Sequence, residues 1–210
     1  MSKRMLQRYE SGERINHWLV AGLFVLAALS GLSFFHPSLY FLNVFLGGGV
    51  WARILHPFLG VAMCVCFAVL YAKLWRDNLM TAADREWAMH AGEMLKGDKS
   101  RMPPVGKYNA GQKGVFWLMT VCLVVLLVTG VMFWQPWFAS SFPILLRRIA
   151  VVLHALSAVG LILGVIVHVY AAIWVKGTVQ AMTRGTVSEA WARQNHPLWH
   201  KKMTGGGPGD

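Results

Sequence analysis

Long apolar stretches alternate with polar ones along this 210-residue chain. No Lys, Arg, Asp or Glu occurs in residues 15–52, 54–72, 114–146 or 149–175. A run of roughly 20 apolar residues is long enough to cross a bilayer as a helix. The pattern therefore predicts four membrane-spanning helices, at residues 15–35, 52–75, 112–134 and 149–175.

Proline and glycine mark where these helices end. Pro37 and Pro136 cannot continue a helix. The apolar stretch 39–46 is too short to span, so we expect it at the membrane interface, ending at three successive glycines. The pattern favours an all-α integral membrane protein, a four-transmembrane-helix bundle forming one domain over residues 1–200. Residues 201–210 are expected to be a polar, disordered tail.

The basic start before the first apolar run also resembles a signal peptide. The apolar run from residue 18 to 35 is longer than the core of a usual signal sequence. We therefore expect it to be the first membrane helix rather than a segment that is removed.

The basic residues are unevenly distributed over the predicted loops. Four Lys or Arg precede the first helix, six lie in residues 76–111 and five in the tail, whereas the other two loops carry three in total. Cytoplasmic loops of membrane proteins are enriched in Lys and Arg, so both termini are predicted to be cytoplasmic. The net charge of +11 has this origin, and we expect no nucleic-acid partner.

The composition excludes several other classes of protein. The chain is 56% hydrophobic and only 14% charged, which is typical of a membrane protein. Four spans also occupy so much of the 210 residues that no separate soluble domain fits. Its three cysteines, at positions 64, 66 and 122, lack the paired spacing of zinc or iron–sulfur sites. We expect them to be apolar packing residues.

Four histidines lie within the predicted spans, where ionisable residues are costly and are therefore functional candidates. His17 is at the cytoplasmic start of the first helix and His56 at the outer start of the second. His154 and His168 both belong to the fourth helix. Their separation of fourteen residues is about 40° short of four turns and spans roughly 21 Å, so both imidazoles project from one face at different membrane depths.

Each histidine of the fourth helix has a predicted partner at its own depth. His154 matches His56 on the outer side, and His168 matches His17 on the inner side. Two imidazoles close both axial positions of a haem iron, an arrangement that suits electron transfer. A single membrane histidine is more often a packing residue, but four that form two depth-matched pairs favour two b-type haems. The remaining histidines, at positions 36, 90, 196 and 200, are expected to be structural or solvated.

Glycine and arginine residues near these histidines have two interpretations. The spans contain glycines at positions 22, 31, 60, 130, 160 and 164. Glycines in membrane helices allow close helix packing, and a porphyrin also needs a bare backbone beside it. The span ends carry arginines at positions 14, 53, 147 and 148, which suit either haem propionates or ordinary flanking charge.

With these residues placed, the chain resembles the cytochrome b (gamma) subunit of membrane-bound respiratory formate dehydrogenases over nearly its whole length. The matching stretches are ERINHW at 13–18, RILHPFLG at 53–60, GKYNAGQK at 106–113, WVKG at 174–177, and WAR and HPLW within 191–199. The segment from about residue 201 departs from the family pattern. So does His36, where the family needs no histidine.

The resemblance implies the same haem ligand pairs and adds a quinone site. Menaquinone or ubiquinone would bind beside the inner haem, at Asn109, Gly111, Gln112 and His168. Asn109 and Gln112 offer the donors and acceptors that a quinone carbonyl needs. From the residues alone, the same two side chains are equally typical of a helix start.

The resemblance also implies partners and a location. An iron–sulfur (beta) subunit would deliver electrons from a molybdenum or tungsten catalytic (alpha) subunit, in the inner membrane of a bacterium. This chain would then transfer electrons and reduce quinone without oxidising formate itself. Alternatives are a cytochrome b of another respiratory complex such as a hydrogenase, a haem-free membrane anchor, and a stand-alone quinone oxidoreductase.

Overall fold

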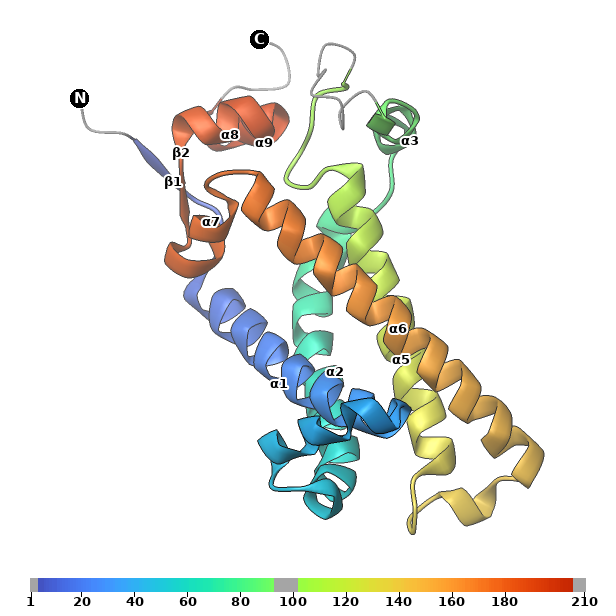
Figure 1. The fold of residues 1–210 in the computed structure, drawn as a ribbon. Helices are drawn as coiled ribbons and strands as arrows, with labels where there is room; N and C mark the ends of the chain where they lie inside the picture. Colours follow the sequence, from blue (N-terminus) through green and yellow to red (C-terminus); the bar gives the residue numbers. More distant parts are fainter. Residues whose placement is uncertain (1–3, 93–101, 206–210) are drawn as a thin grey trace. The chain divides into compact units, whose positions relative to one another are not determined.

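The computed structural model describes residues 4–92 and 102–205 and contains four long apolar helices (Figure 1). They are α1 (Ser11–Phe35), α2 (Gly49–Leu74), α5 (Ala110–Phe133) and α6 (Ile144–Trp174). Each is long and apolar enough to cross a membrane. The predicted four spans are thereby confirmed as helices, and they support a multi-pass membrane protein.

All four long helices begin earlier than the apolar pattern indicates, and α1 and α6 differ most. α1 starts at Ser11, four residues before the predicted start, and Glu13 in its first turn accepts a hydrogen bond from the Glu10 N–H. α6 starts at Ile144, so Arg147 and Arg148 belong to its first turns rather than to a loop. A helix needs only a hydrogen-bonded backbone, so charged residues in its first turns do not end it, although they end a continuous apolar run.

Short helices fill the connections between the long ones. The predicted interfacial stretch forms the 3₁₀ helix η1 (Pro37–Leu46), which ends at Gly47 in the left-handed region with φ 84°. The described residues of the other connections include the short helices η2 (Trp75–Asn78), α3 (Ala82–Met89) and η3 (Ala139–Ser141). The sequence predicted no helix at these three places.

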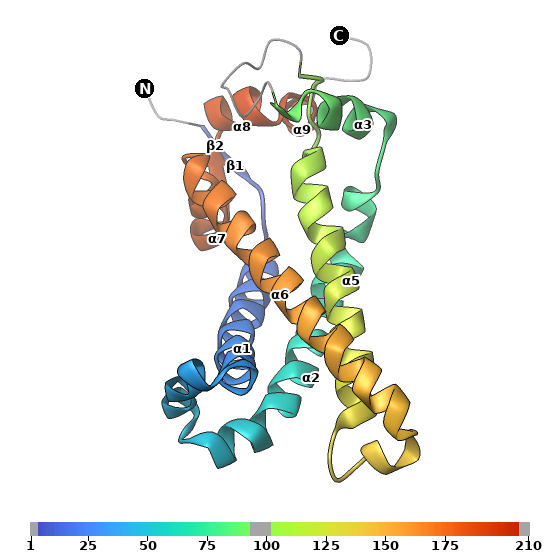
Figure 2. The ribbon, with the colours of Figure 1, turned by 45° about the vertical axis from the view of Figure 1, so that its right-hand side comes forward.

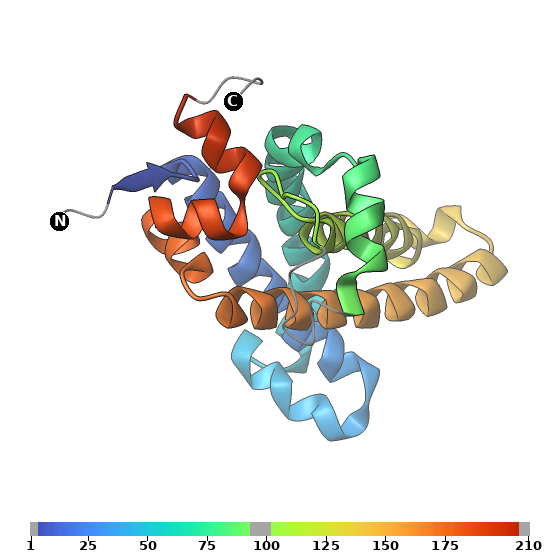
Figure 3. The same cartoon turned by 90° about the horizontal axis from the view of Figure 1, so that it is seen from above.

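The described chain divides into two compact units, and residues 15–72 and 118–167 form one of them. Its core joins Met63 of α2 to Cys122 and Leu123 of α5 and to Leu161 of α6. α6 passes close to α5 (Figure 3), and a Cβ added at Gly164 would lie 3.1 Å from Leu118 Cδ2. Gly164 therefore lies at a close contact between the two helices, as the helix-packing interpretation expects, and a side chain there would require Leu118 to shift.

The other unit comprises the described residues of 1–14, 73–117 and 168–210. Here β1 (Met5–Gln7) pairs antiparallel with β2 (Thr186–Ser188), with Leu6 opposite Val187 (Figure 2). The helices α7 (Thr178–Arg184), α8 (Glu189–Asn195) and α9 (Pro197–Met203) flank β2 in sequence. Leu6, Ala181, Val187, Ala192 and Trp199 form the core of this unit.

The amino-terminal and carboxy-terminal segments therefore fold together, which corrects the expectation of an all-α chain. The correction is small, since the sheet has two strands of three residues each. α9 continues to Met203, three residues past the predicted domain boundary at 200. Residues 206–210, at the end of the expected disordered tail, lie outside the described residues.

Candidate functional site

Two of the predicted ligands lie next to each other. The imidazoles of His56 on α2 and His154 on α6 have ring centroids 6.2 Å apart, with planes inclined at 60°. Both rings are half-buried and belong to the same compact unit. The structure thus brings together two histidines that are 98 positions apart in the sequence.

A buried hydroxyl group holds each of these imidazoles by its Nδ1 atom. Ser30 Oγ on α1 lies 2.8 Å from His56 Nδ1, and Thr129 Oγ1 on α5 lies 3.0 Å from His154 Nδ1. A backbone carbonyl also hydrogen-bonds each ring, that of Ala27 for His56 and that of Leu126 for His154. The Nε2 atom of neither histidine has a side-chain partner among the described residues, which leaves it as the candidate metal-binding nitrogen.

The same three residue types surround each ring. Gly31 and Gly130 follow the two hydroxyl residues, and an added Cβ would lie 3.4 Å from His56 Cε1 or 3.3 Å from His154 Cε1. A phenylalanine follows one turn later in each helix. Phe34 lies 5.8 Å from the His56 ring and Phe133 lies 5.1 Å from the His154 ring, both edge-on.

This repeated pattern, [Ser/Thr]-Gly-x-x-Phe, occurs as SGLSF at 30–34 and as TGVMF at 129–133. In both cases it lies on the helix that precedes the histidine-bearing helix. The sequence contains this signal. Gly31 and Gly130 could be recognised as positions that suit a porphyrin, but the hydroxyl residue before each could not, because a serine or threonine in a membrane helix usually bonds its own backbone.

The pair has the dimensions of a bis-imidazole haem site. Metal–imidazole bonds of about 2 Å on both sides of one ion set the ring centres roughly 6 Å apart, close to the observed separation. The two glycines leave backbone without Cβ atoms directly beside the rings. Two imidazoles meet the axial requirement of iron in a porphyrin, whose macrocycle supplies the other ligands.

Arg147 adds a second observation that suits a haem. Its Nε atom is buried and has no hydrogen-bond partner among the described residues. Arg147 lies seven residues before His154 on α6, which places it on nearly the same helix face about 10.5 Å away along the axis. A guanidinium with a buried, unpaired Nε at that position is chemically suited to a propionate.

The other predicted pair is described separately for each histidine. His17 is half-buried on α1 and lies edge-on to Trp18, with ring centroids 5.3 Å apart. His168 lies on α6, the helix that also carries His154. Because His17 and His168 belong to different compact units, their pairing stays a prediction.

The predicted quinone residues Asn109 and Gln112 cap the start of α5. The Gln112 N–H donates to Asn109 Oδ1 at 2.8 Å, and the Asn109 N–H donates to Gln112 Oε1 at 3.0 Å. This reciprocal arrangement satisfies backbone groups that the helix itself cannot pair. It uses only the two amide oxygens, so both amide NH₂ groups lack a partner among the described residues.

Gly111 lines a pocket of about 800 Å³ between α3 and the start of α5. Trp87 of α3 covers it closely, since a Cβ on Gly111 would lie 3.2 Å from Trp87 Cη2. Asp84 lies in the same wall. The predicted quinone residues 109, 111, 112 and 168 all belong to the same compact unit.

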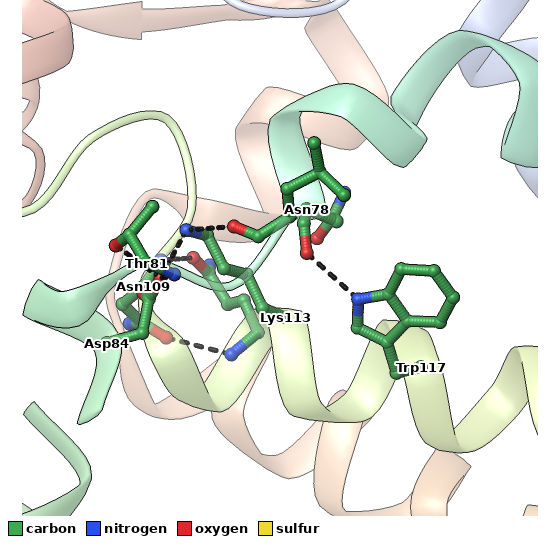
Figure 4. A network of polar contacts seen from close by, with 8 residues as sticks. Asn78, Thr81, Asp84, Asn109, Lys113 and Trp117 are labelled. Carbon is green, nitrogen blue, oxygen red and sulfur yellow. Dashed lines mark hydrogen bonds and ion pairs between the residues drawn. The ribbon is translucent and has the colours of Figure 1, made fainter.

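A buried ion pair joins α3 to α5 beside this pocket (Figure 4). Lys113 Nζ lies 2.6 Å from Asp84 Oδ2 and also donates to the Leu79 carbonyl at 3.0 Å. Thr81 donates to the same carboxylate oxygen through its N–H and its hydroxyl. Burial raises the pKa of Asp84, but hydrogen bonds from Lys113 and Thr81 and the Lys113 charge outweigh it and hold this pKa below its ordinary value.

Arg8 and His196 form a second buried polar cluster. Arg8 donates to the Lys107 carbonyl at 2.6 Å and lies 3.3 Å from His196 Nε2. Its guanidinium also lies over four aromatic rings, those of Tyr9, Tyr108, Trp191 and Trp199. Burial, with a smaller effect from the Arg8 charge, lowers the pKa of His196 to about 4.

Other histidines outside the spans also have structural contacts. His36 Nδ1 accepts a hydrogen bond from the Ser38 N–H and caps η1. His200 Nε2 lies 3.2 Å from Glu189 Oε1. The two contacts agree with the structural roles expected for these residues.

A bundle of apolar helices that presents two facing imidazoles defines the class of membrane haem proteins. The sequence model of the prokaryotic cytochrome b561 family matches residues 8–185. The chain belongs to this family, which implies a b-type haem.

The chain is also similar to individual proteins, which are subunits of formate dehydrogenases. The chain is 45% identical to the formate dehydrogenase cytochrome b556(fdo) subunit of Escherichia coli K12, over 93% of this chain and 92% of the relative. It is 41% identical to the cytochrome b556(Fdn) subunit of the nitrate-inducible formate dehydrogenase of the same organism, over 97% and 94%. Identity to the formate dehydrogenase cytochrome b556 subunit of Haemophilus influenzae is 38%, over 93% and 82%.

Proposed function

We propose that this chain is the membrane cytochrome b subunit of a respiratory formate dehydrogenase. It would pass electrons from a periplasmic iron–sulfur subunit, through two b-type haems, to menaquinone or ubiquinone at the cytoplasmic side. The observation that carries the proposal is the His56–His154 pair at 6.2 Å in a cytochrome family member. The similarity of this chain to three formate dehydrogenase subunits supports the choice of formate dehydrogenase as the complex.

The residues of the outer site have separate tasks. A b-type haem with two imidazole ligands supplies one-electron transfer and has no open iron position for oxygen. His56 and His154 would hold the iron through Nε2, while Ser30 and Thr129 orient the two rings. Arg147 would hold a propionate, and the glycines beside the rings admit the macrocycle.

The inner site remains part of the proposal. His17 and His168 would hold the second haem, and Asn109, Gly111, Gln112 and His168 would hold the quinone. The amide NH₂ groups that remain after capping support this assignment, because a quinone carbonyl accepts hydrogen bonds. Gly111 in the wall of a pocket supports it further.

The membrane orientation gives the electron transfer a direction. Both termini would be cytoplasmic, and the complex would lie in a bacterial inner membrane with its iron–sulfur and molybdenum or tungsten subunits outside. Each electron that moves inward against the membrane potential costs about 2.3 kcal/mol per 100 mV. The energy released between formate and quinone must exceed that cost.

Two alternatives are weaker. A haem-free anchor does not agree with membership of a cytochrome family. A hydrogenase cytochrome would share the helix plan, but the named relatives belong to formate dehydrogenases.

Purification of the membrane complex through a tag on this chain tests the proposal. We expect the iron–sulfur and catalytic subunits to copurify, and formate to reduce the haem absorption bands and then added menaquinone. Reduction by hydrogen but not by formate would instead indicate a hydrogenase. A preparation that contains no haem would contradict the proposal as a whole.

A further inference from the structure

We propose that Ser30 and Thr129 are positioning residues that set the redox potential of the outer haem. They would do so by accepting the Nδ1–H of its two histidine ligands. The inference rests on the proposed function, since it requires a haem between His56 and His154. It goes further by assigning a role to two hydroxyl groups that bind neither haem nor substrate.

The direction of each hydrogen bond follows from the donors available. Ser30 Oγ lies 3.0 Å from the Leu26 carbonyl and 2.9 Å from the Ala27 carbonyl, so its single proton points back to its own helix. The oxygen therefore faces His56 with a lone pair, and in the proposed arrangement it accepts from Nδ1–H beside the Ala27 carbonyl, which also hydrogen-bonds this ring. This fixes the neutral tautomer in which Nε2 carries the lone pair that binds a metal ion.

Thr129 repeats the arrangement on the other side. Its Oγ1 lies 2.6 Å from the Val125 carbonyl and therefore donates there, leaving a lone pair for His154 Nδ1–H. Two helices of different sequence thus present the same polar contact to the two ligands. An ordinary helix-packing serine or threonine needs only the bond to its own carbonyl.

The chemical type of the acceptor is what matters for the potential. Ligating histidines commonly donate Nδ1–H to a carboxylate, a backbone carbonyl or water, and this bond raises the basicity of the ligand. A more basic ligand stabilises ferric iron over ferrous iron and lowers the potential. A neutral hydroxyl withdraws the proton less than a carboxylate does. The outer haem is thereby held at a higher potential than a carboxylate would allow, while its ligands stay oriented.

Burial strengthens the effect. Ser30 is 0% exposed and Thr129 is 4% exposed, so water does not compete for either contact. Electrostatic interactions are also stronger in such a low-dielectric site than at a surface.

The test uses the complete purified complex and potentiometric titration of both haems. Thr129→Val removes the hydroxyl and preserves the side-chain shape, and Ser30→Ala removes the other hydroxyl. Each should weaken ligand basicity and raise the midpoint potential of the outer haem only. The expected shift is up to about tenfold in the one-electron equilibrium, or about 59 mV. The low-spin electron paramagnetic resonance signal of that haem should change as well.

Two matched variants control for packing. Thr129→Ser keeps the hydroxyl and should keep the wild-type potential. Ser33→Ala removes a nearby buried hydroxyl that contacts Asn43 rather than an imidazole, and it should also leave the potential unchanged.

The outcomes separate this inference from the proposed function. Unchanged potentials in both Thr129→Val and Ser30→Ala, with two haems retained, would overturn it. Loss of the outer haem in Thr129→Val but not in Thr129→Ser would support it, whereas loss in both would overturn it because side-chain volume alone would then decide binding. If His154→Ala retains both haems, the proposed function itself fails.

Discussion

At the scale of single residues, the histidines differ in which ring nitrogens have side-chain or backbone partners. His56 and His154 each have Nδ1 within hydrogen-bond distance of a hydroxyl group and Nε2 without a side-chain partner among the described residues. His196 uses both ring nitrogens, for Gly106 and for Arg8. A histidine with both nitrogens occupied is a structural cross-link, whereas one with Nε2 available can bind a metal ion.

His196 predicts a dependence of stability on pH. Its pKa of about 4 in the folded state lies below the ordinary 6.5, so below pH 6.5 the unfolded chain binds the proton first. Stability is therefore complete above pH 6.5, falls as the pH decreases toward 4, and changes no further below it. The loss should reach roughly 3 kcal/mol.

Thermal unfolding in detergent at pH 7.5 and pH 5 measures this effect. The midpoint of the wild-type chain should decrease more between the two values than that of His196→Asn, which can still donate to Gly106 but does not titrate. Equal decreases would show that protonation of His196 does not control the stability of this cluster.

At the scale of elements, the two histidine-bearing helices are built in the same way. Each follows a helix that carries [Ser/Thr]-Gly-x-x-Phe, and this preceding helix supplies the hydroxyl, the bare backbone and the aromatic edge around the imidazole. Each pair of consecutive helices thus provides one ligand together with its support. The proposed haem site therefore draws on all four long helices.

The start of α5 combines a cap with the predicted quinone contact, and a substitution can separate the two roles. Asn109→Asp keeps an oxygen that accepts the Gln112 N–H but loses the amide NH₂. Asn109→Ala loses both, and loss of such a cap costs about 0.5–2 kcal/mol. We expect both variants to slow quinone reduction with both haems intact, and only Asn109→Ala to unfold at a lower temperature.

Steady-state reduction of a menaquinone analogue and thermal unfolding are the two measurements required. Wild-type turnover in Asn109→Asp would restrict Asn109 to its capping role. Gly114→Ala, on the exposed side of the same helix start, is the matched control. An added Cβ at Gly114 meets nothing within 4 Å.

The accuracy of sequence-based prediction also varied between elements. The four apolar helices were predicted because burial in lipid demands a continuous apolar run, which is visible in the sequence. α3, α7, α8 and α9 were not, because short helices in polar segments depend on tertiary contacts such as Asp84–Lys113 and Arg8–His196. The end of β1 and the start of β2 are 179 positions apart, and nothing local indicates their pairing.

At the scale of the whole chain, the pairing of the membrane histidines could be proposed from the predicted topology alone. His56 and His154 were paired by equal membrane depth, and the structure brings them together. Ser30 and Thr129 could not be found in this way. A hydroxyl in a membrane helix usually bonds its own backbone, and only the coordinates show the imidazole on its other side.

The central claim is that two pairs of histidines hold two haems in one chain. Pyridine haemochrome quantification of the purified complex, in the wild type and in His154→Ala, His17→Ala and the control His36→Ala, tests it most directly. We expect two haems per chain in the wild type and in His36→Ala. We expect one haem per chain in His154→Ala and in His17→Ala, with the low-spin signal of the outer haem lost in the first and that of the inner haem lost in the second. Two haems in His154→Ala, or fewer than two in the wild type, would contradict it.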